Sequence, residues 1–144
     1  MHTVKNSLTF VSGSTQGIGL AIARAFVDNE ARVVVHGRTE AKSCEAAGQI
    51  GASGAVWGDL STTEGANDVL AQLKQIGAVE ILINNAGIFS VEDFFKLPDE
   101  EWHRYYQTNV MSLVRLCRAL MLIDSADQRL RADHFTAFDF SSIG

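Results

Sequence analysis

The sequence predicts an α/β fold in which a parallel, doubly wound sheet has helices on both faces. The first observation is that short apolar runs alternate with helical patterns along the chain. The second is ARVVVHG at 31–37, which is β-branched and continuously apolar, as expected of a strand buried on both faces. The third is a glycine cluster at 12–19, which separates the first apolar run from the first helical pattern. Right-handed connections between such strands place helices on both sides of one sheet.

The composition narrows the class of protein further. The chain has 144 residues, of which 47% are hydrophobic and 20% charged, so one globular domain is expected. A net charge of -5 argues against nucleic acid or an anionic membrane as a partner. No apolar run approaches the roughly 20 residues that span a bilayer, and the N-terminus has no signal-peptide pattern, so a cytoplasmic location is expected. We expect no metal site, because the cysteines lack metal-ligand spacing and the scattered histidines are interpreted as surface residues. These residues are Cys44, Cys117, His2, His36, His103 and His134.

The first half of the chain contains three predicted strands and two predicted helices. SLTFVS at 7–12 is a short apolar run that suits a strand. The helix at 18–29 carries apolar residues at helical spacing; they are Ile18, Ile22 and Phe26. After the second strand, residues 39–50 are predicted to form a helix with Thr39 as its N-cap, since a threonine hydroxyl can accept a hydrogen bond from the first turn. GAVWGDL at 54–60 is a weaker third strand.

The second half continues the alternation. The helix predicted at 62–76 has one apolar face, formed by Ala66, Val69, Leu70, Leu73 and Ile76. VEILINNAG at 79–87 is a strong strand that ends in a turn. A long helix is predicted from about Asp99, with an apolar stripe formed by Tyr106, Val110, Leu113, Cys117 and Leu120. HFTAFDFSS at 134–142 is the fifth predicted strand.

The glycine cluster predicts a site for the phosphates of a dinucleotide. Gly13, Gly17 and Gly19 lie after a strand and open a helix, where a tight turn and a close backbone approach to a pyrophosphate need glycine. Free N–H groups at the helix start then face the phosphates. The alternative is a tight turn with a purely structural role. The residues predicted to bind the cofactor here are Gly13, Ser14, Thr15, Gln16, Gly17, Ile18 and Gly19.

The end of the second strand favours NADP over NAD. An acidic residue that binds the ribose of NAD is expected there, but Gly37 occupies its position and Arg38 follows. Without the acid a 2′-phosphate is not repelled, and the guanidinium of Arg38 can pair with it. The alternative is that Arg38 is a solvated loop charge, and neutral Gln16 adds no second cation. NAD therefore remains open as the cofactor.

Four motifs together resemble the short-chain dehydrogenase/reductase family: SGSTQGIG at 12–19, NNAG at 84–87, the asparagine of YYQTNVMS, and the closing SSIG. Within that family the chain looks like bacterial 3-oxoacyl-[acyl-carrier-protein] reductases. The resemblance implies one Rossmann-like, NAD(P)-binding domain at 1–144 with strand order 3-2-1-4-5. The family's sixth and seventh strands have no counterpart here. We therefore expect the sheet to stop after the fifth strand and the domain to be incomplete at its C-terminus.

The resemblance also implies cofactor contacts beyond the glycine turn. Asp59 and Leu60 would contact the adenine ring, although Asp59 has an equally good interpretation as a loop or helix-capping residue. The residues after the fourth strand that would face the cofactor are Asn85, Ala86 and Gly87. Asn84 would support the central sheet.

The resemblance implies that two residues belong to the catalytic centre. Asn109 would hold a water in a proton relay, the alternative being an asparagine that points outward from its helix. Ser142 would donate a hydrogen bond to the substrate carbonyl where negative charge develops, the alternative being a turn serine at a strand end. The reaction implied is hydride transfer to or from a small carbonyl or alcohol substrate.

The family's acid/base pair, a tyrosine followed four residues later by lysine, is absent from this sequence. Tyr105 and Tyr106 are the only tyrosines, and four residues after them lie Asn109 and Val110. We therefore expect an NADP(H)-preferring oxidoreductase by resemblance, with the 144 residues inactive alone and a homo-oligomer for a full-length form. The alternatives are a non-catalytic nucleotide-binding module and a truncated pseudogene product.

Overall fold

The fold is built on a parallel four-stranded sheet. The computed structural model describes residues 4–123. Within that range the strand order is β3-β2-β1-β4, and each neighbouring pair is parallel. The strands are β1 (Leu8–Val11), β2 (Arg32–Gly37), β3 (Gly54–Trp57) and β4 (Ile81–Ile83). The α/β class and the order of the first four strands are confirmed, whereas the predicted fifth strand at 134–142 lies outside the described residues.

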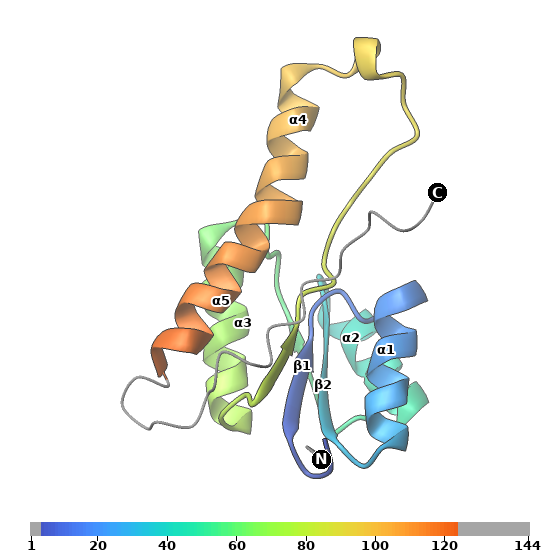
Figure 1. Ribbon diagram of the computed structural model, residues 1–144, viewed down its shortest axis with the longest axis vertical. Coiled ribbons are helices and arrows are strands. Elements are labelled where there is room, and N and C mark those ends of the chain that lie inside the picture. The colour runs from blue at the N-terminus through green and yellow to red at the C-terminus, as the bar shows by residue number, and fades with distance from the viewer. Residues whose placement is uncertain (1–3, 124–144) are drawn as a thin grey trace.

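Helices cover both faces of this sheet (Figure 1). One face packs against α1 (Gly17–Asp28) and α2 (Glu40–Ile50), and the other against α3 (Thr63–Ile76) and α5 (Ser112–Ile123). Between β4 and α5 the chain forms a short 3₁₀ turn, η1, a helix, α4, and a π-helical segment, η2. Their bounds are Phe94–Lys96, Asp99–Tyr105 and Tyr106–Met111.

The core of the molecule lies on the two faces of β2. Val33 and Val35 pack with the apolar residues of α1 and α2, while Val34 packs with those of α3 and α5. All three valines are fully buried. The continuous apolar run therefore forms a strand buried on both faces, as predicted, because successive side chains point to opposite sides of a sheet.

The local signals of α2 and α3 gave mixed results. In α3 the predicted apolar face is confirmed: Ala66, Val69 and Leu73 are buried in the core, and Leu70 and Ile76 pack against it. Thr62 caps this helix, since its hydroxyl accepts a hydrogen bond from Gly65 N at 3.0 Å. Thr39 does precede α2, but its hydroxyl makes no cap bond, and its carbonyl accepts from the Ser43 hydroxyl instead.

The predicted stripe along the last helix is wrong in its first half. Leu116, Cys117 and Leu120 are buried, but Tyr106 is 52% and Val110 42% exposed. Both exposed residues lie in the π-helical segment η2, which has more residues per turn than an α-helix, so they do not continue the face of α5 that follows. This part of the helix also rises beyond the sheet and has no core to face (Figure 1).

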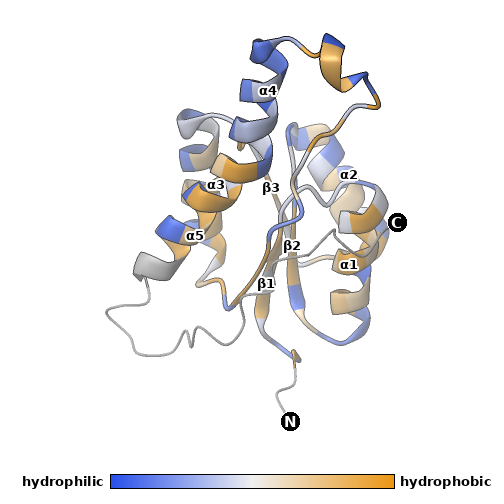
Figure 2. Cartoon of the chain, turned by 45° about the horizontal axis from the view of Figure 1, so that its top comes forward, coloured by the Kyte–Doolittle hydropathy of each residue, from blue (hydrophilic) through white to orange (hydrophobic). Residues whose placement is uncertain are grey.

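The segment from 88 to 106, called the projecting segment below, carries exposed apolar side chains. Figure 2 shows apolar colour on the loop and η1 at the top of the molecule, away from the sheet. Phe89 is 88% and Phe95 91% exposed, and Phe94 makes an edge contact with Trp102 at a ring distance of 5.5 Å. A search of the described helices for one long and apolar enough to cross a membrane found none.

Candidate functional site

The glycine turn between β1 and α1 is compact, and Gly13 and Gly19 leave no room for a side chain. A Cβ on Gly13 would lie 2.9 Å from the Cα of Ala86, and one on Gly19 would lie 2.3 Å from the carbonyl oxygen of Gly13. Gly13 and Gly17 also have φ angles of +62° and +57°, which favour glycine. The turn therefore folds back on itself and packs directly against the loop that follows β4.

Hydrogen bonds fix the turn to that loop. The hydroxyl of Ser12 accepts from the backbone N–H groups of Asn85 and Ala86, both at 3.0 Å. The side-chain amide of Asn85 donates to the carbonyls of Ser12 and Gly13, at 3.2 and 2.9 Å. Asn85 and Ala86, predicted to face a cofactor, thus lie beside the turn that was predicted to bind its phosphates.

The start of α1 has the chemistry of an anion site. Gln16 occupies the N-cap position, and within the described residues no side chain caps this helix and no acid lies in its first turn. Gln16, Gly17 and Ile18 are exposed. The first N–H groups of a helix lack intrahelical partners and carry partial positive charge, so they attract phosphate oxygens.

The end of β2 is closed to an acidic side chain. A Cβ on Gly37 would lie 2.4 Å from the Cγ2 of Thr15 and 2.8 Å from the hydroxyl of Ser43. The predicted position of a ribose-binding acid is therefore filled by Thr15 of the glycine turn. Arg38 follows and is exposed, at the same edge of the sheet as the turn.

The loop after β3 places Asp59 close enough to Arg38 for their charges to interact. The Asp59 carboxylate accepts from the N–H and the hydroxyl of Ser61, at 2.9 and 2.7 Å. Partial burial opposes ionisation of Asp59, but the Ser61 bonds and the charges of Arg38 and His36 outweigh it and lower the pKa of the carboxyl. The side chain of Leu60 lies in the core and is 3% exposed. Contact of these two residues with adenine stays a prediction.

His36 is the residue that sequence reasoning missed. It was interpreted as a surface histidine, but it is 3% exposed and both ring nitrogens are hydrogen-bonded, to Gly13 and Gly58. The interpretation was wrong because β2 is buried on both faces up to its last residue. The signal was present in the sequence, since His36 directly follows three consecutive valines in the most apolar strand.

Asn109 connects the helix to the loop after β4. It lies in η2, and its side-chain amide makes two bonds with the backbone of Ile88. Its oxygen accepts from Ile88 N at 2.7 Å, and its nitrogen donates to Ile88 O at 2.8 Å. Gly87 lies against it, because a Cβ there would be 3.3 Å from the Asn109 oxygen. The predicted water-holding role of Asn109 is untested by these contacts.

Asn84 faces the helix layer. Its amide nitrogen donates to the sulfur of Cys117 at 3.4 Å, and its oxygen is buried with no hydrogen-bond partner in the described part of the chain. Burial raises the pKa of the Cys117 thiol, with the Asn84 bond acting in the opposite direction. The last predicted site residue, Ser142, lies outside the described residues. Among residues 4–123, no three His, Cys, Asp or Glu side chains come together as metal ligands.

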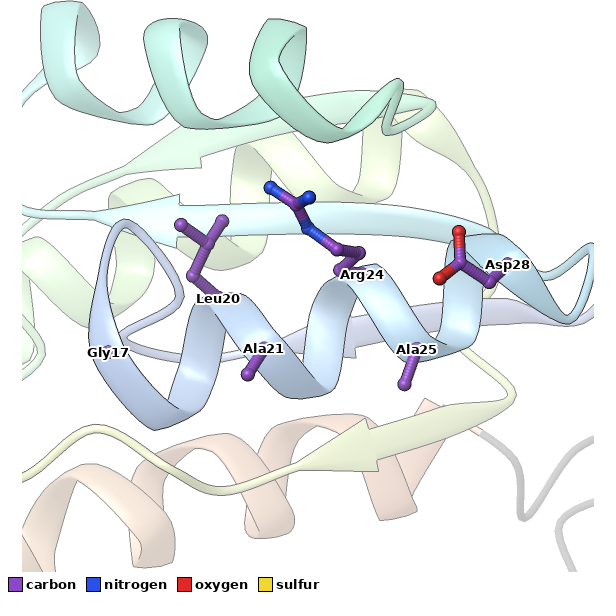
Figure 3. Close-up of a pocket in the computed structure, with 6 residues that line it drawn as sticks. All are labelled: Gly17, Leu20, Ala21, Arg24, Ala25 and Asp28. Atoms are coloured by element: carbon purple, nitrogen blue, oxygen red, sulfur yellow. The ribbon is translucent and has the colours of Figure 1, made fainter.

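A separate hollow runs along α1, with a volume of about 330 Å³. Figure 3 shows the residues that line it: Gly17, Leu20, Ala21, Arg24, Ala25 and Asp28. It touches the glycine turn only at Gly17 and then follows the helix towards its C-terminus. Ser12, Gly37, Arg38 and Asn85, which surround the turn, are not part of it. The polar groups of the candidate site thus lie at the carboxyl ends of the strands and not in this hollow.

Comparison with known proteins gives a consistent picture. The family model for short chain dehydrogenase matches residues 7–127. The uncharacterized oxidoreductase YvrD of Bacillus subtilis is 40% identical over 118 residues, which is 80% of this chain and 45% of that protein. The 3-oxoacyl-[acyl-carrier-protein] reductase FabG of Escherichia coli is 30% identical over 119 residues, 81% of this chain and 49% of FabG. The chain spans about half the length of the curated relatives that it matches.

Solved structures of similar fold include complexes with NADP(H). L-sorbose reductase from Gluconobacter frateurii, complexed with NADPH and L-sorbose, aligns with a TM-score of 0.75 at 33% identity and covers 84% of this chain and 49% of its own. The RhlG/NADP active-site complex of Pseudomonas aeruginosa aligns with a TM-score of 0.76 at 28% identity, covering 84% and 50%.

Proposed function

Because this chain belongs to the short-chain dehydrogenase family, we propose that it forms the NADP(H)-binding part of an oxidoreductase. The substrate would be a small carbonyl compound or the corresponding alcohol. The observation that carries the proposal is the uncapped start of α1, which the glycine turn holds at the same sheet edge as Arg38.

The proposal assigns each part of the site one task in cofactor binding. The backbone of the glycine turn binds the pyrophosphate, with N–H groups as donors and no acid nearby in the turn to repel it. Arg38 pairs with the 2′-phosphate, while Asp59 and Leu60 bind the adenine side. The loop with Asn85, Ala86 and Gly87 lines the nicotinamide side and is kept in place by Ser12.

The closed end of β2 supports NADP(H) over NAD(H). Position 37 is a glycine, so it offers no carboxylate to bind the ribose 2′-hydroxyl, and Thr15 fills the space that a side chain there would need. Arg38 supplies instead a permanent positive charge with donors that match a phosphate. Asp59 partly offsets that charge, since the two side chains interact.

In the reaction, the bound dinucleotide supplies or accepts the hydride. Asn109 keeps the loop after Gly87 against the helix by its two bonds with Ile88, and we assign it the additional task of holding a water for proton transfer. Ser142 would donate a hydrogen bond to the substrate oxygen. The 144 residues contain no Tyr-x-x-x-Lys sequence, so we expect them to bind the dinucleotide without turnover; NADPH oxidation by this chain would contradict that.

The relatives support a carbonyl substrate without selecting one. FabG acts on a 3-oxoacyl group by its name, and the sorbose reductase structure holds L-sorbose. A 3-oxoacyl-type substrate is our finer proposal, because FabG proteins recur among the curated relatives. A homo-oligomer is proposed for a full-length form.

The test compares binding of NADPH and NADH by calorimetry in the wild-type chain and in Arg38→Asp. We expect NADPH to bind more tightly than NADH, and the substitution to weaken NADPH binding by about tenfold or more, because a charge-assisted bond is replaced by repulsion. Arg24→Asp is the matched control, because Arg24 is exposed on α1 and its substitution changes the net charge by the same amount. An equal loss in both variants, or no change in the NADPH/NADH ratio for Arg38→Asp, would contradict the assignment.

A further inference from the structure

The ring of His36 bridges two loops of the candidate site. Its Nδ1 accepts a hydrogen bond from the backbone N–H of Gly13 at 3.0 Å, and its Nε2 lies 3.1 Å from the carbonyl oxygen of Gly58. A backbone N–H can only donate and a carbonyl can only accept, so the partners themselves fix the proton on Nε2. Only the neutral imidazole, in this one tautomer, satisfies both bonds.

The backbone around His36 strengthens the same connection. His36 N donates to the Ser14 hydroxyl, and Ser14 N donates to the carbonyl of His36, both at 2.9 Å. One residue further along, Gly37 O accepts from Gly58 N at 3.1 Å. The end of β2 is thereby tied to the loops that follow β1 and β3.

Gly13 is held from two sides by this arrangement. His36 accepts from its N–H, and the Asn85 amide donates to its carbonyl. The N–H and the carbonyl of Gly13 are thus both hydrogen-bonded, and its φ angle is +62°. These contacts fix the direction in which the backbone leaves Gly13 towards Gly17. Gly58 in turn directly precedes Asp59, so its position sets where the adenine-side loop begins.

We propose that His36 is a positioning residue for the dinucleotide: in its neutral form it accepts from Gly13 and so holds the phosphate turn in place, while its bond to Gly58 orients the ring for this task. This rests on the proposed NADP(H) binding. A protonated ring carries N–H on both nitrogens, so it faces the N–H of Gly13 with a donor and loses that bond. Cofactor affinity should therefore fall when His36 is protonated.

The surroundings of His36 favour the neutral form at neutral pH. Burial lowers its pKa from 6.5, and the Gly58 bond and the negative charge of Asp59 oppose this without cancelling it. From β1 it is faced by the uncharged ring of Phe10, at a centroid distance of 6.0 Å. The glycine turn at 12–19 contains no charged residue. Arg38 follows His36 by two residues, just after the end of β2. The neutral form of His36 is therefore favoured at neutral pH, and protonation requires more acidic conditions than for an ordinary histidine.

Two substitutions of His36 each keep one of its two side-chain hydrogen bonds and remove the other. In His36→Asn the side-chain oxygen can take the place of Nδ1 and accept from Gly13, but it cannot reach Gly58. In His36→Gln the amide can take the place of Nε2 and reach Gly58, but not Gly13. Neither side chain titrates in this range. His103→Asn is the matched control, because His103 is an exposed histidine on α4.

The experiment measures the dissociation constant of NADP+ for these variants from neutral pH to well below 6.5. We expect His36→Gln to bind about tenfold more weakly at neutral pH, as for a buried donor left without its acceptor. His36→Asn should bind within about threefold of wild type and lose the additional acid-side weakening that wild type shows. The titration of the cofactor itself is the same for every variant. The ratio of the dissociation constants of variant and wild type at each pH therefore reports the effect of His36 alone.

The ring-nitrogen NMR shifts of wild type provide a second readout that needs no variant. They should report the Nε2–H tautomer at neutral pH, and a pKa for His36 that is lower than that of an ordinary histidine. If wild type binds NADP+ but His36→Asn and His36→Gln behave alike, or if the ring carries its proton on Nδ1, the positioning role is overturned while the proposed function stands. If wild type binds no dinucleotide at all, the proposed function fails and this inference with it.

Discussion

The sheet with its helices and the projecting segment both contain large apolar side chains, but these are buried in the first region and exposed in the second. Phe10 in β1 is fully buried between the helix layers, whereas Phe95 in η1 is 91% exposed. The turns at the carboxyl ends of the strands are joined by hydrogen bonds between distant residues, such as Ser12 with Ala86 and His36 with Gly58. The projecting segment is joined to the rest mainly through Asn109 and Ile88.

This difference shows that apolar content does not by itself mark the core. In the sheet, side chains alternate between two faces that are both covered, so each apolar residue contributes to stability. In the projecting segment no layer covers Phe89 or Phe95, and the aromatic contacts of Phe94 and Trp102 are local. The residues proposed to bind the dinucleotide belong to the first region, where buried contacts fix the positions of the strands and their turns.

The largest expected difference between the regions comes from truncating one phenylalanine in each. Phe10→Ala should lower the free energy of unfolding by about 3–5 kcal/mol, because it removes a buried ring and leaves a cavity. Phe95→Ala should change it by about 0.5 kcal/mol or less, as for other surface substitutions. Urea unfolding of the two variants measures both values, and similar losses would mean that the projecting segment is as well packed as the sheet.

A smaller effect is expected from adding one methyl group at two helical glycines. Gly19→Ala places a Cβ 2.3 Å from the Gly13 oxygen, so the turn must shift, with an expected loss of about 1–3 kcal/mol. In Gly48→Ala, within α2, the new Cβ meets nothing within 4 Å. Alanine is the better helix former there and should stabilise the chain by about 0.5–1 kcal/mol.

The melting temperature should therefore fall in Gly19→Ala and rise in Gly48→Ala. Destabilisation by both alanines would show that general helix effects, and not the close approach of the turn, account for Gly19.

The smallest effect concerns the connection between the two regions. Asn109→Ala removes both bonds with Ile88, so amide exchange should become faster at Ile88 and through the projecting segment, while β1 and β2 stay protected. We expect a change of about 1 kcal/mol in global stability. Asn67→Ala, at an exposed position of α3, is the control and should leave exchange at Ile88 unchanged.

The sequence was sufficient to predict the features that depend on local periodicity. The buried strand with Val34 and the apolar face of α3 with Val69 follow from spacing alone, since a period of two or 3.6 residues fixes which side chains share a face. The position of the glycine turn was equally clear, because the glycines lie between an apolar strand pattern and a helical pattern.

The features that failed depend on long-range contacts or on irregular geometry. The apolar stripe was wrong at Tyr106 and Val110 because a π-helical segment interrupts the spacing, and nothing in YQTNVM indicates it. The role of His36 depends on Gly58, which is 22 residues away. The partner of Asn109 depends on where the loop after β4 passes, 21 residues earlier in the chain.

The most direct test of the central claim maps where NADP+ binds along the isotope-labelled chain. Titration should produce saturable amide shifts that are largest in the glycine turn at 12–19, at Arg38 and Asp59, and in the loop at 84–87. Amides of the projecting segment and of Asp28, at the far end of the α1 hollow, should move little. Shifts confined to the hollow or to the projecting segment, or no shifts at all, would contradict the assignment of a dinucleotide site to the carboxyl ends of the strands.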